Sequence, residues 1–169
     1  MWGKEDEVRV VKEKIRSWEE LKGEVDRLKA RGKKIVFTNG CFDILHVGHT
    51  RYLGEAKKLG DVLVVAVNSD SSVKAIKGEK RPLVPETERV EVVASLEAVD
   101  FVTIFAEETP VTLIEELKPN VIVKGGDWDE KNVAGRESVR KWGGRVAIIP
   151  QVEGVSTTNV VEKIRKIYA

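Results

Sequence analysis

Short apolar runs alternate with helix-forming segments along most of this chain, and this alternation limits the folds that it can adopt. The runs are rich in Val and Ile and do not alternate with polar residues, which is typical of parallel strands buried on both faces. They cover Lys34–Thr38, Asp61–Asn68, Asp100–Phe105, Val121–Gly125 and Arg145–Pro150. Strands that alternate with helices predict an α/β fold with a doubly wound, mostly parallel five-stranded sheet.

Helical patterns occupy the intervals between these runs. The predicted helices cover Thr50–Leu59, Glu86–Ala98, Val111–Leu117, Arg136–Trp142 and the stretch from about Thr157 to Tyr168. They supply the crossovers that a parallel sheet requires.

A charged amphipathic segment precedes the first apolar run. Between Glu5 and Arg31, apolar residues recur at steps of three and four, which predicts a helix with an interruption at Gly23 and a C-cap at Gly32. We interpret it as a helix that packs its apolar stripe on the domain, rather than as a docking helix for a partner. The expected organisation is an N-terminal helical extension, residues 1–31, followed by one domain, residues 32–169.

Composition narrows the class of protein. The 169 residues suit a single domain, and 41% hydrophobic residues are enough for a core. With 29 Lys and Arg against 28 Asp and Glu, the net charge is +1, which argues against non-specific nucleic-acid binding. Cys41 is the single cysteine, which excludes an intrachain disulfide. The sequence shows no signal peptide and no apolar run long enough to cross a bilayer, so we expect a cytoplasmic protein without a membrane partner.

Residues that carry chemistry gather after the predicted strands. Ligands of an open parallel sheet bind beyond the carboxyl ends of its strands. The segments in question are Asn39–His49, Asn68–Arg81, Lys124–Arg136 and Gln151–Thr158. We therefore expect one ligand site, built from these four segments.

The first of these segments predicts a phosphate site. His46 and His49 are the two histidines of the chain, and they bracket Gly48 where a helix is expected to begin. A helix N-terminus favours anions, and imidazole donors beside it would hold phosphate oxygens. A pair of structural histidines and a metal pair are the alternatives, although metal-binding histidines on a helix usually stand four residues apart, as in HExxH.

The other three segments offer cations, glycine turns and a second helix start. Lys74 and Lys77 lie near Asp70, and the alternative for each lysine is a solvated surface charge. Arg81 and Arg89 follow, and Arg89 has an intrahelical ion pair with Glu86 as its alternative. The turn Lys124-Gly125-Gly126-Asp127-Trp128 allows close approach of a ligand and adds a flat aromatic face. Ser156 and Thr157 open the last helix, either as caps alone or also as donors to phosphate.

At the first segment the chain resembles a known family. GCFDILHVGH resembles the GxFDxxHxGH motif of the nucleotidyltransferase superfamily, which contains the cytidylyltransferases and adenylyltransferases. The segments NSDSSVKAIKG, RPLVPETERV, KGGDW, VAGRE and VEGVSTTNVVEKI are similar to the heptose-1-phosphate adenylyltransferase domain of ADP-heptose synthase. That resemblance implies a Rossmann-like nucleotidyltransferase fold from about Arg31 onward, without the sugar kinase part of the bifunctional members.

The resemblance also implies roles for individual residues. It assigns catalysis to His46, His49 and Lys74. It implies nucleotide binding by Gly40, Cys41, Phe42, Gly48, Lys124, Gly126, Asp127, Gly135, Ser156 and Thr157. It implies substrate binding by Asn39, Asp43, Asn68, Asp70, Lys77, Arg81 and Arg89. Mg2+ is expected to enter with ATP, and no side chain is assigned as a direct metal ligand.

The implied reaction moves AMP from ATP to D-glycero-β-D-manno-heptose 1-phosphate, giving ADP-heptose and pyrophosphate for lipopolysaccharide core precursor synthesis. A cytidylyltransferase acting on a polyol or amino-alcohol phosphate is the nearest alternative, although Gln151-Val152 replace the Arg-Thr usual in that motif. A non-catalytic nucleotide-binding module is another, because fold does not fix function. A fragment of a class I aminoacyl-tRNA synthetase is disfavoured by the small size, the neutral charge and the lack of a KMSKS-like loop. An exposed helix stripe or edge strand would permit a homodimer.

Overall fold

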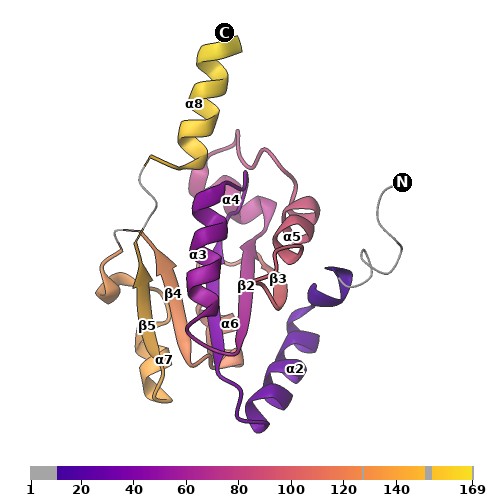
Figure 1. Cartoon of the computed structure of the whole chain (residues 1–169), viewed down its shortest axis with the longest axis vertical. Helices are drawn as coiled ribbons and strands as arrows, with labels where there is room; N and C mark the ends of the chain where they lie inside the picture. Colours follow the sequence, from indigo (N-terminus) through magenta and orange to yellow (C-terminus); the bar gives the residue numbers. More distant parts are fainter. Residues whose placement is uncertain (1–10, 127, 151–153, 169) are drawn as a thin grey trace.

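A five-stranded parallel sheet forms the centre of the computed structural model, which describes residues 11–126, 128–150 and 154–168. The strands are β1 (Ile35–Gly40), β2 (Val62–Asn68), β3 (Phe101–Phe105), β4 (Val121–Gly125) and β5 (Arg145–Ile149). All neighbours pair in parallel, in the order β3-β2-β1-β4-β5 (Figure 1). This confirms the predicted doubly wound α/β fold, with each strand starting and ending within a residue or two of its predicted bounds.

Helices follow the strands much as the sequence predicts. They are α2 (Trp18–Ala30), α3 (Val47–Lys57), α4 (Asp70–Lys77), α5 (Glu86–Ala94), α6 (Val111–Leu117), α7 (Arg136–Lys141) and α8 (Thr157–Tyr168), with a short 3-10 turn, η1 (Glu130–Asn132). Helix α4 is not among the helices that the sequence predicts. It is a helix because the Ser69 hydroxyl accepts a hydrogen bond from the Ser72 N–H, and Gly78 ends it at φ 92°.

The two faces of the sheet carry separate cores. On one face, α2, α6 and α7 pack on side chains such as Ile35 and Phe37 of β1. On the other face, α3 and α5 pack on Val36 of the same strand. Alternate residues of each inner strand thus enter opposite cores, which explains why the strands read as continuous apolar runs.

The segment before α2 covers the free edge of β3. Ile15 forms a parallel bridge with Val102, and the Arg16 N–H donates to the Val102 carbonyl at 2.9 Å. The Trp18 indole N–H donates to the Ile104 carbonyl at 2.7 Å. An exposed strand edge invites pairing with other chains, so this cover protects the fold.

The same contacts correct the predicted N-terminal helix. Residues 11–14 are helical, the chain is extended at 15–17, and α2 then continues through Gly23 without a break. The predicted interruption at Gly23 is therefore wrong. A helix restarts after the break because Ser17 and Glu20 form a reciprocal capping box. Residues 1–10 lie outside the described residues.

Helix α2 packs on the domain, as the sequence analysis favoured. Leu21 and Val25 are fully buried in the core that also contains Ile35 and Phe37. Gly32, at φ 76°, follows the helix, and its N–H donates to the Lys29 carbonyl at 2.9 Å, which confirms its place at the C-terminal cap. The division of the chain at residue 31 stays a prediction.

The sheet order creates a switch point at β1. From β1 the chain moves to β2 and β3 on one side, and then returns to β4 and β5 on the other. Connections that leave in opposite directions open a crevice at the carboxyl ends of the central strands. The first turn of α8 returns to this edge, while the rest of that helix projects from the body (Figure 1). In the part of the chain that the structure describes, no helix combines the length and apolar character needed to span a bilayer.

The burial of α2 leads to a stability prediction. We expect Leu21→Ala to lower the free energy of unfolding by about 2–5 kcal/mol, since it leaves a cavity in a filled core. Urea denaturation measures the change. The control Lys22→Ala removes an exposed i,i+4 pair with Asp26 and should change stability by less than about 0.5 kcal/mol. Equal stability of wild type and Leu21→Ala would mean that α2 is a dispensable extension.

Candidate active site

A cavity of about 460 Å³ opens at the carboxyl ends of β1, β2 and β4. All four segments singled out from the sequence contribute to its walls. The predicted site residues that line it are Asn39, Gly40, Cys41, Phe42, Asp43, His46, Gly48, His49, Asn68, Lys77, Arg81, Lys124, Ser156 and Thr157. The fold thus brings the histidines and the late Ser-Thr turn to one cavity.

The two histidines stand together at the start of α3. Their rings are stacked, with centroids 3.9 Å apart and planes inclined at 29°. The His46 backbone N–H points to Nδ1 of His49 over a long 3.4 Å. Nδ1 of His46 is buried and has no hydrogen-bond partner within the described ranges of the chain. A buried polar atom without a partner is costly, and a ligand atom would satisfy it.

Both imidazoles are neutral at neutral pH in the free protein. Burial lowers the pKa of His46. Burial, with a smaller contribution from the neighbouring His46 ring, lowers the pKa of His49 to about 4. Two cationic rings stacked this closely would repel each other. Each neutral ring has one N–H to donate and one nitrogen that accepts, so the pair acts as two hydrogen-bond donors rather than as two cations.

Glycine at position 48 is required by the histidine stack. A Cβ there would lie 2.9 Å from both Cε1 and Nδ1 of His46. Phe42 packs against the stack, with its ring centroid 5.5 Å from that of His49. A Cβ at Gly40 would in turn meet the Phe42 ring at 3.0 Å. The residues of this motif therefore pack against one another as well as facing the cavity.

Lys124 brings a cation to the opposite wall. Its ammonium group donates to Oδ1 of Asn39 at 2.5 Å and lies 5.6 Å from the centroid of the Trp128 ring. Burial lowers its pKa to about 8, against a smaller opposing effect of Cys41. The group is charged at neutral pH but only weakly hydrated, which favours pairing with a phosphate.

Asp43 holds a third wall in place. One of its carboxylate oxygens accepts from Nε of Arg81 at 2.5 Å, and the other accepts from the backbone N–H groups of Leu83 and Val84 at 2.8 and 2.9 Å. The carboxylate is almost fully buried. Although Asp43 lines the cavity, its hydrogen bonds indicate a structural role: it holds the segment after α4 in place and orients Arg81.

Arg89 and Asp70 were predicted to bind substrate, and the structure places neither of them on the cavity wall. The Arg89 guanidinium is fully buried and donates to the Cys41 carbonyl at 2.5 Å, the Val84 carbonyl at 2.9 Å and Oδ1 of Asp70 at 2.7 Å. The ion pair between Arg89 and Glu86, which was the alternative, is not among these hydrogen bonds. The Glu86 carboxylate instead accepts from the Asp70 N–H. Arg89 therefore stabilises the loops that contain Cys41 and Val84, without lining the cavity itself.

Of the two lysines on α4, the structure brings Lys77 to the cavity and not Lys74. Val73 faces the sheet and is buried, and Lys77 lies one turn later on the same side of the helix. Lys74 follows Val73 directly, about 100° around the helix, and is not among the residues that line the cavity, although both lysine side chains are exposed. A catalytic role for Lys74 stays a prediction.

Two predicted glycines lie away from the cavity. A Cβ at Gly135 would meet Cδ1 of Ile114 at 2.7 Å, so this glycine lets α7 start against the core. Gly126, at φ 94°, donates its N–H to the Ile149 carbonyl, and its neighbour Gly125 lines the cavity instead. Asp127 lies outside the described residues.

The start of α8 confirms the capping role of the Ser-Thr turn, and donation to phosphate stays a prediction. The Ser156 hydroxyl accepts from the Asn159 N–H at 3.0 Å, which makes it a helix cap. A hydroxyl that accepts in this way keeps its own hydrogen for another partner. The Thr157 hydroxyl donates to the Ile44 carbonyl at 3.2 Å and ties α8 to the loop before α3. Ser156 is thus the better placed of the two to donate to a ligand.

Sequence reasoning missed several residues of the cavity wall. The additional lining residues are Tyr52, Ile76, Pro150, Val155 and Thr158. Tyr52 could have been found, because it follows His49 by three residues and so lies on the same side of α3. Ile76, Val155 and Thr158 lie within segments that the sequence singled out, but no pattern distinguished them from their neighbours there.

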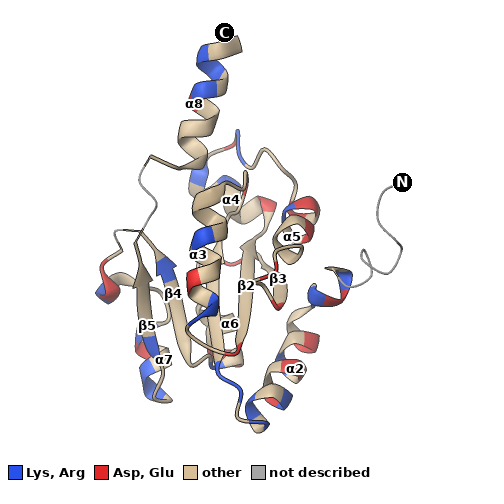
Figure 2. Cartoon of the chain, in the orientation of Figure 1, with Lys and Arg blue, Asp and Glu red and all other residues tan. Residues whose placement is uncertain are grey.

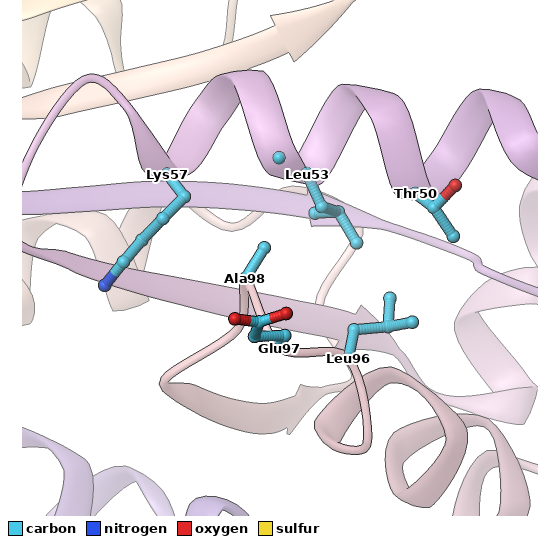
Figure 3. A pocket seen from close by; sticks show the side chains of 7 residues that line it. Thr50, Leu53, Lys57, Leu96, Glu97 and Ala98 are labelled. Carbon is cyan, nitrogen blue, oxygen red and sulfur yellow. The ribbon is translucent and has the colours of Figure 1, made fainter.

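A second hollow lies beside α3, between this helix and the connection from α5 to β3 (Figure 3). Leu53, Leu96 and Ala98 are its apolar lining residues. The cation on its wall, Lys57, already donates to Asp100 at 2.5 Å and to the Asp61 carbonyl at 2.6 Å. This hollow lacks the converging donors of the cavity at the strand ends.

The cavity suits phosphates better than a resident metal ion. Among the residues that the structure describes, no group of three or more His, Cys, Asp or Glu side chains could hold a metal. The carboxylate of the wall, Asp43, is occupied by Arg81 and two backbone donors. Lysine, arginine, imidazole and hydroxyl donors remain, and these bind anions. Figure 2 marks basic positions on α4 and β4, and Lys77 and Lys124 of these two elements line the cavity.

An open parallel sheet with a donor-lined crevice at its switch point defines an α/β protein of the nucleotide-binding class. The family model described as cytidylyltransferase-like matches residues 37–163. The chain belongs to this family, and it is a nucleotidyltransferase.

Individual relatives agree with this assignment. The chain is 55% identical, over 155 residues, to the bifunctional protein HldE of Geobacter metallireducens, covering 92% of this chain and 32% of that protein. It therefore spans about a third of the length of the curated relatives that it matches. A lipopolysaccharide core biosynthesis protein from Thermoplasma volcanium is 36% identical, with a TM-score of 0.59, covering 72% of this chain and 98% of that one. Pantothenate synthetase from Thermus thermophilus, 18% identical with a TM-score of 0.62 over 90% and 70% of the two chains, shares the fold.

The lowered pKa of Lys124 leads to a pH prediction. Below about pH 8 the ammonium group is charged, and above it the group loses its proton and its attraction for an anion. We expect the Kd of a nucleoside triphosphate to rise above pH 8, by up to about tenfold per pH unit, because binding and protonation are linked. Titration calorimetry from pH 6.5 to 9.5 measures it. Lys124→Arg stays charged and should flatten the profile; an unchanged slope in that variant would assign the effect to another group.

Proposed function

We propose that this protein transfers AMP from ATP to a sugar 1-phosphate, D-glycero-β-D-manno-heptose 1-phosphate, releasing pyrophosphate. The observation that carries the proposal is the meeting of the stacked His46 and His49 with Lys124 and the start of α8 in one cavity. The names of the relatives, HldE and a lipopolysaccharide core biosynthesis protein, support the choice of a heptose substrate for lipopolysaccharide precursor synthesis.

In the proposed reaction, a phosphate oxygen of the sugar phosphate attacks the α-phosphorus of ATP. A new P–O bond forms in line with the bond that breaks, and pyrophosphate leaves with that bond's electrons. The attacking phosphate is already largely anionic at neutral pH, since its second pKa is near 6. No general base is needed, which agrees with a cavity wall made of donors and cations. Catalysis then consists of positioning and of stabilising charge on the phosphorus centre.

The chain's residues divide this work between them. Neutral His46 and His49 donate hydrogen bonds to oxygens of the transferred phosphoryl group. Lys124, and Lys77 in place of Lys74, offset the charge that develops on the leaving phosphates, and Ser156 donates to them. Asn68 and Arg81, which also line the cavity, are assigned to the sugar phosphate. Mg2+ enters as part of the MgATP substrate, held by the phosphates, and supplies further charge neutralisation there.

Cytidylyl transfer is the second candidate, because the family model is described as cytidylyltransferase-like. Gln151 and Val152, where this chain departs from the cytidylyltransferase motif, lie outside the described residues. The HldE relatives favour adenylyl transfer over it. A homodimer and a cytoplasmic location stay predictions.

A substrate panel tests the proposed function. We expect pyrophosphate release with ATP and a heptose 1-phosphate, and at least about tenfold lower kcat/KM with CTP, because a site that hydrogen-bonds one base leaves polar groups unpaired with another. The panel pairs ATP, CTP, GTP and UTP with several sugar 1-phosphates and with polyol phosphates. Preference for CTP and a polyol phosphate would select the second candidate. Nucleotide binding without pyrophosphate release from any pair would identify a non-catalytic module.

Removal of either imidazole tests the mechanism. We expect His49→Ala and His46→Ala each to lower kcat by at least about 100-fold, the usual cost of losing a preorganised donor. Pyrophosphate release gives kcat, and circular dichroism verifies the fold. Arg51→Ala, at an exposed position on the same helix, is the control and should keep wild-type turnover. Turnover within about tenfold of wild type in both histidine variants would contradict the assigned roles.

A further inference from the structure

Tyr52 joins three elements of the fold at the base of the cavity. It stands on α3, and its hydroxyl lies 2.6 Å from the Thr38 hydroxyl of β1 and donates to the Val123 carbonyl of β4 at 3.1 Å. Burial raises the pKa of this phenol, so it is neutral at any working pH. A neutral hydroxyl with two buried partners acts as a fixed brace rather than as an acid or base.

The three braced positions each adjoin a donor of the cavity. Thr38 directly precedes Asn39, and Val123 directly precedes Lys124, while Asn39 and Lys124 are hydrogen-bonded to each other. On the third element, Tyr52 follows His49 by three residues on the same side of α3. The hydroxyl therefore connects the helix that carries the imidazoles to the two strands that carry the opposite wall.

The ring of Tyr52 also explains a glycine of the opposite wall. A Cβ at Gly125 would lie 3.2 and 3.3 Å from Cε2 and Cδ2 of the ring, tighter than ordinary contact. A side chain at 125 would require the Tyr52 ring to move by a few tenths of an ångström. Both residues line the cavity, so the ring takes the space that a side chain at position 125 would otherwise fill.

We propose that Tyr52 is a positioning residue of the nucleotidyl transfer reaction: it fixes the distance between the imidazole donors and the Lys124–Asn39 wall, and Gly125 leaves room for it. The inference rests on the proposed function. When a catalytic donor is misplaced by about 1 Å, the rate of an enzyme can fall by about 100-fold. Tyr52 thus acts through His49 and Lys124, without touching the transferred group.

Tyr52→Phe keeps the ring and removes the brace. We expect kcat to fall about tenfold while the KM for ATP changes less than about threefold, because the imidazoles act mainly in the transition state. In a His49→Ala background the same substitution should lower kcat by less than about twofold, since residues that act as a unit are not additive. Trp18→Phe is the matched control: it removes a hydrogen bond to the Ile104 carbonyl, neither residue lines the cavity, and kcat should stay unchanged.

Imidazole titration gives a readout that does not depend on turnover. The chain has two histidines, so NMR resolves each ring. If Tyr52 holds α3 against β4, its loss lets water reach His49, and the pKa of that imidazole rises from about 4 toward its ordinary value. Trp18→Phe should leave the titration unchanged. If Tyr52 had a purely structural role, Tyr52→Phe would lower thermal stability, as Trp18→Phe does, without moving the pKa of His49.

The claim that Gly125 leaves room for the Tyr52 ring is tested separately. Gly125→Ala should lower kcat by about tenfold or more, and the loss should shrink to about twofold or less in a Tyr52→Leu background, where the ring no longer obstructs the new methyl group. Gly54→Ala, on α3 where a Cβ meets nothing within 4 Å, is the control and should keep full activity.

The outcomes separate this inference from the proposed function. Wild-type kcat together with an unchanged His49 titration in Tyr52→Phe would overturn the inference, as would full additivity with His49→Ala. If the wild-type protein transfers no nucleotide to any phosphate tested, the proposed function fails. The inference then fails with it as a statement about catalysis, even if the titration confirms the brace.

Discussion

The central position of β1 is the constraint on which the site depends. Its two neighbours, β2 and β4, belong to connections that leave in opposite directions, so a crevice opens above its carboxyl end. The chain has to turn there from Gly40 into α3, and that turn places Phe42, His46, Gly48 and His49 at the crevice. Close packing explains the glycines, because a Cβ at Gly40 or Gly48 would collide with the ring beside it.

Buried ionic side chains hold the loops around this crevice in place. Asp43 and Arg89 together bind the backbone of residues 41, 83 and 84 and the side chains of Asp70 and Arg81. A buried charge is costly unless its hydrogen bonds are complete, and these two have three bonds each. Their removal would leave uncompensated groups in the interior, so loss of activity in such variants would not by itself identify a substrate contact.

The electrostatics of the cavity agree with a reaction that needs no base. Burial keeps both imidazoles neutral and leaves Lys124 as a weakly hydrated cation near its titration point. Hydrogen-bond donors that are oriented before the substrate arrives stabilise developing charge at little reorganisation cost. The same desolvation that lowers these pKa values therefore prepares the site for a phosphate anion.

The sequence by itself determined the parallel sheet, most helix positions and the turn that carries the two histidines, since continuous apolar runs and a glycine between two histidines are local patterns. It could not decide which lysine of α4 lines the cavity, because that depends on how this helix, which the sequence did not predict, is placed beside the sheet. Nor could it separate Arg89, which binds carbonyls of two distant loops, from a substrate ligand, or find the bridge from Tyr52 to Thr38 and Val123. Those outcomes depend on contacts between residues far apart in the chain, and only the packed tertiary structure brings such residues together.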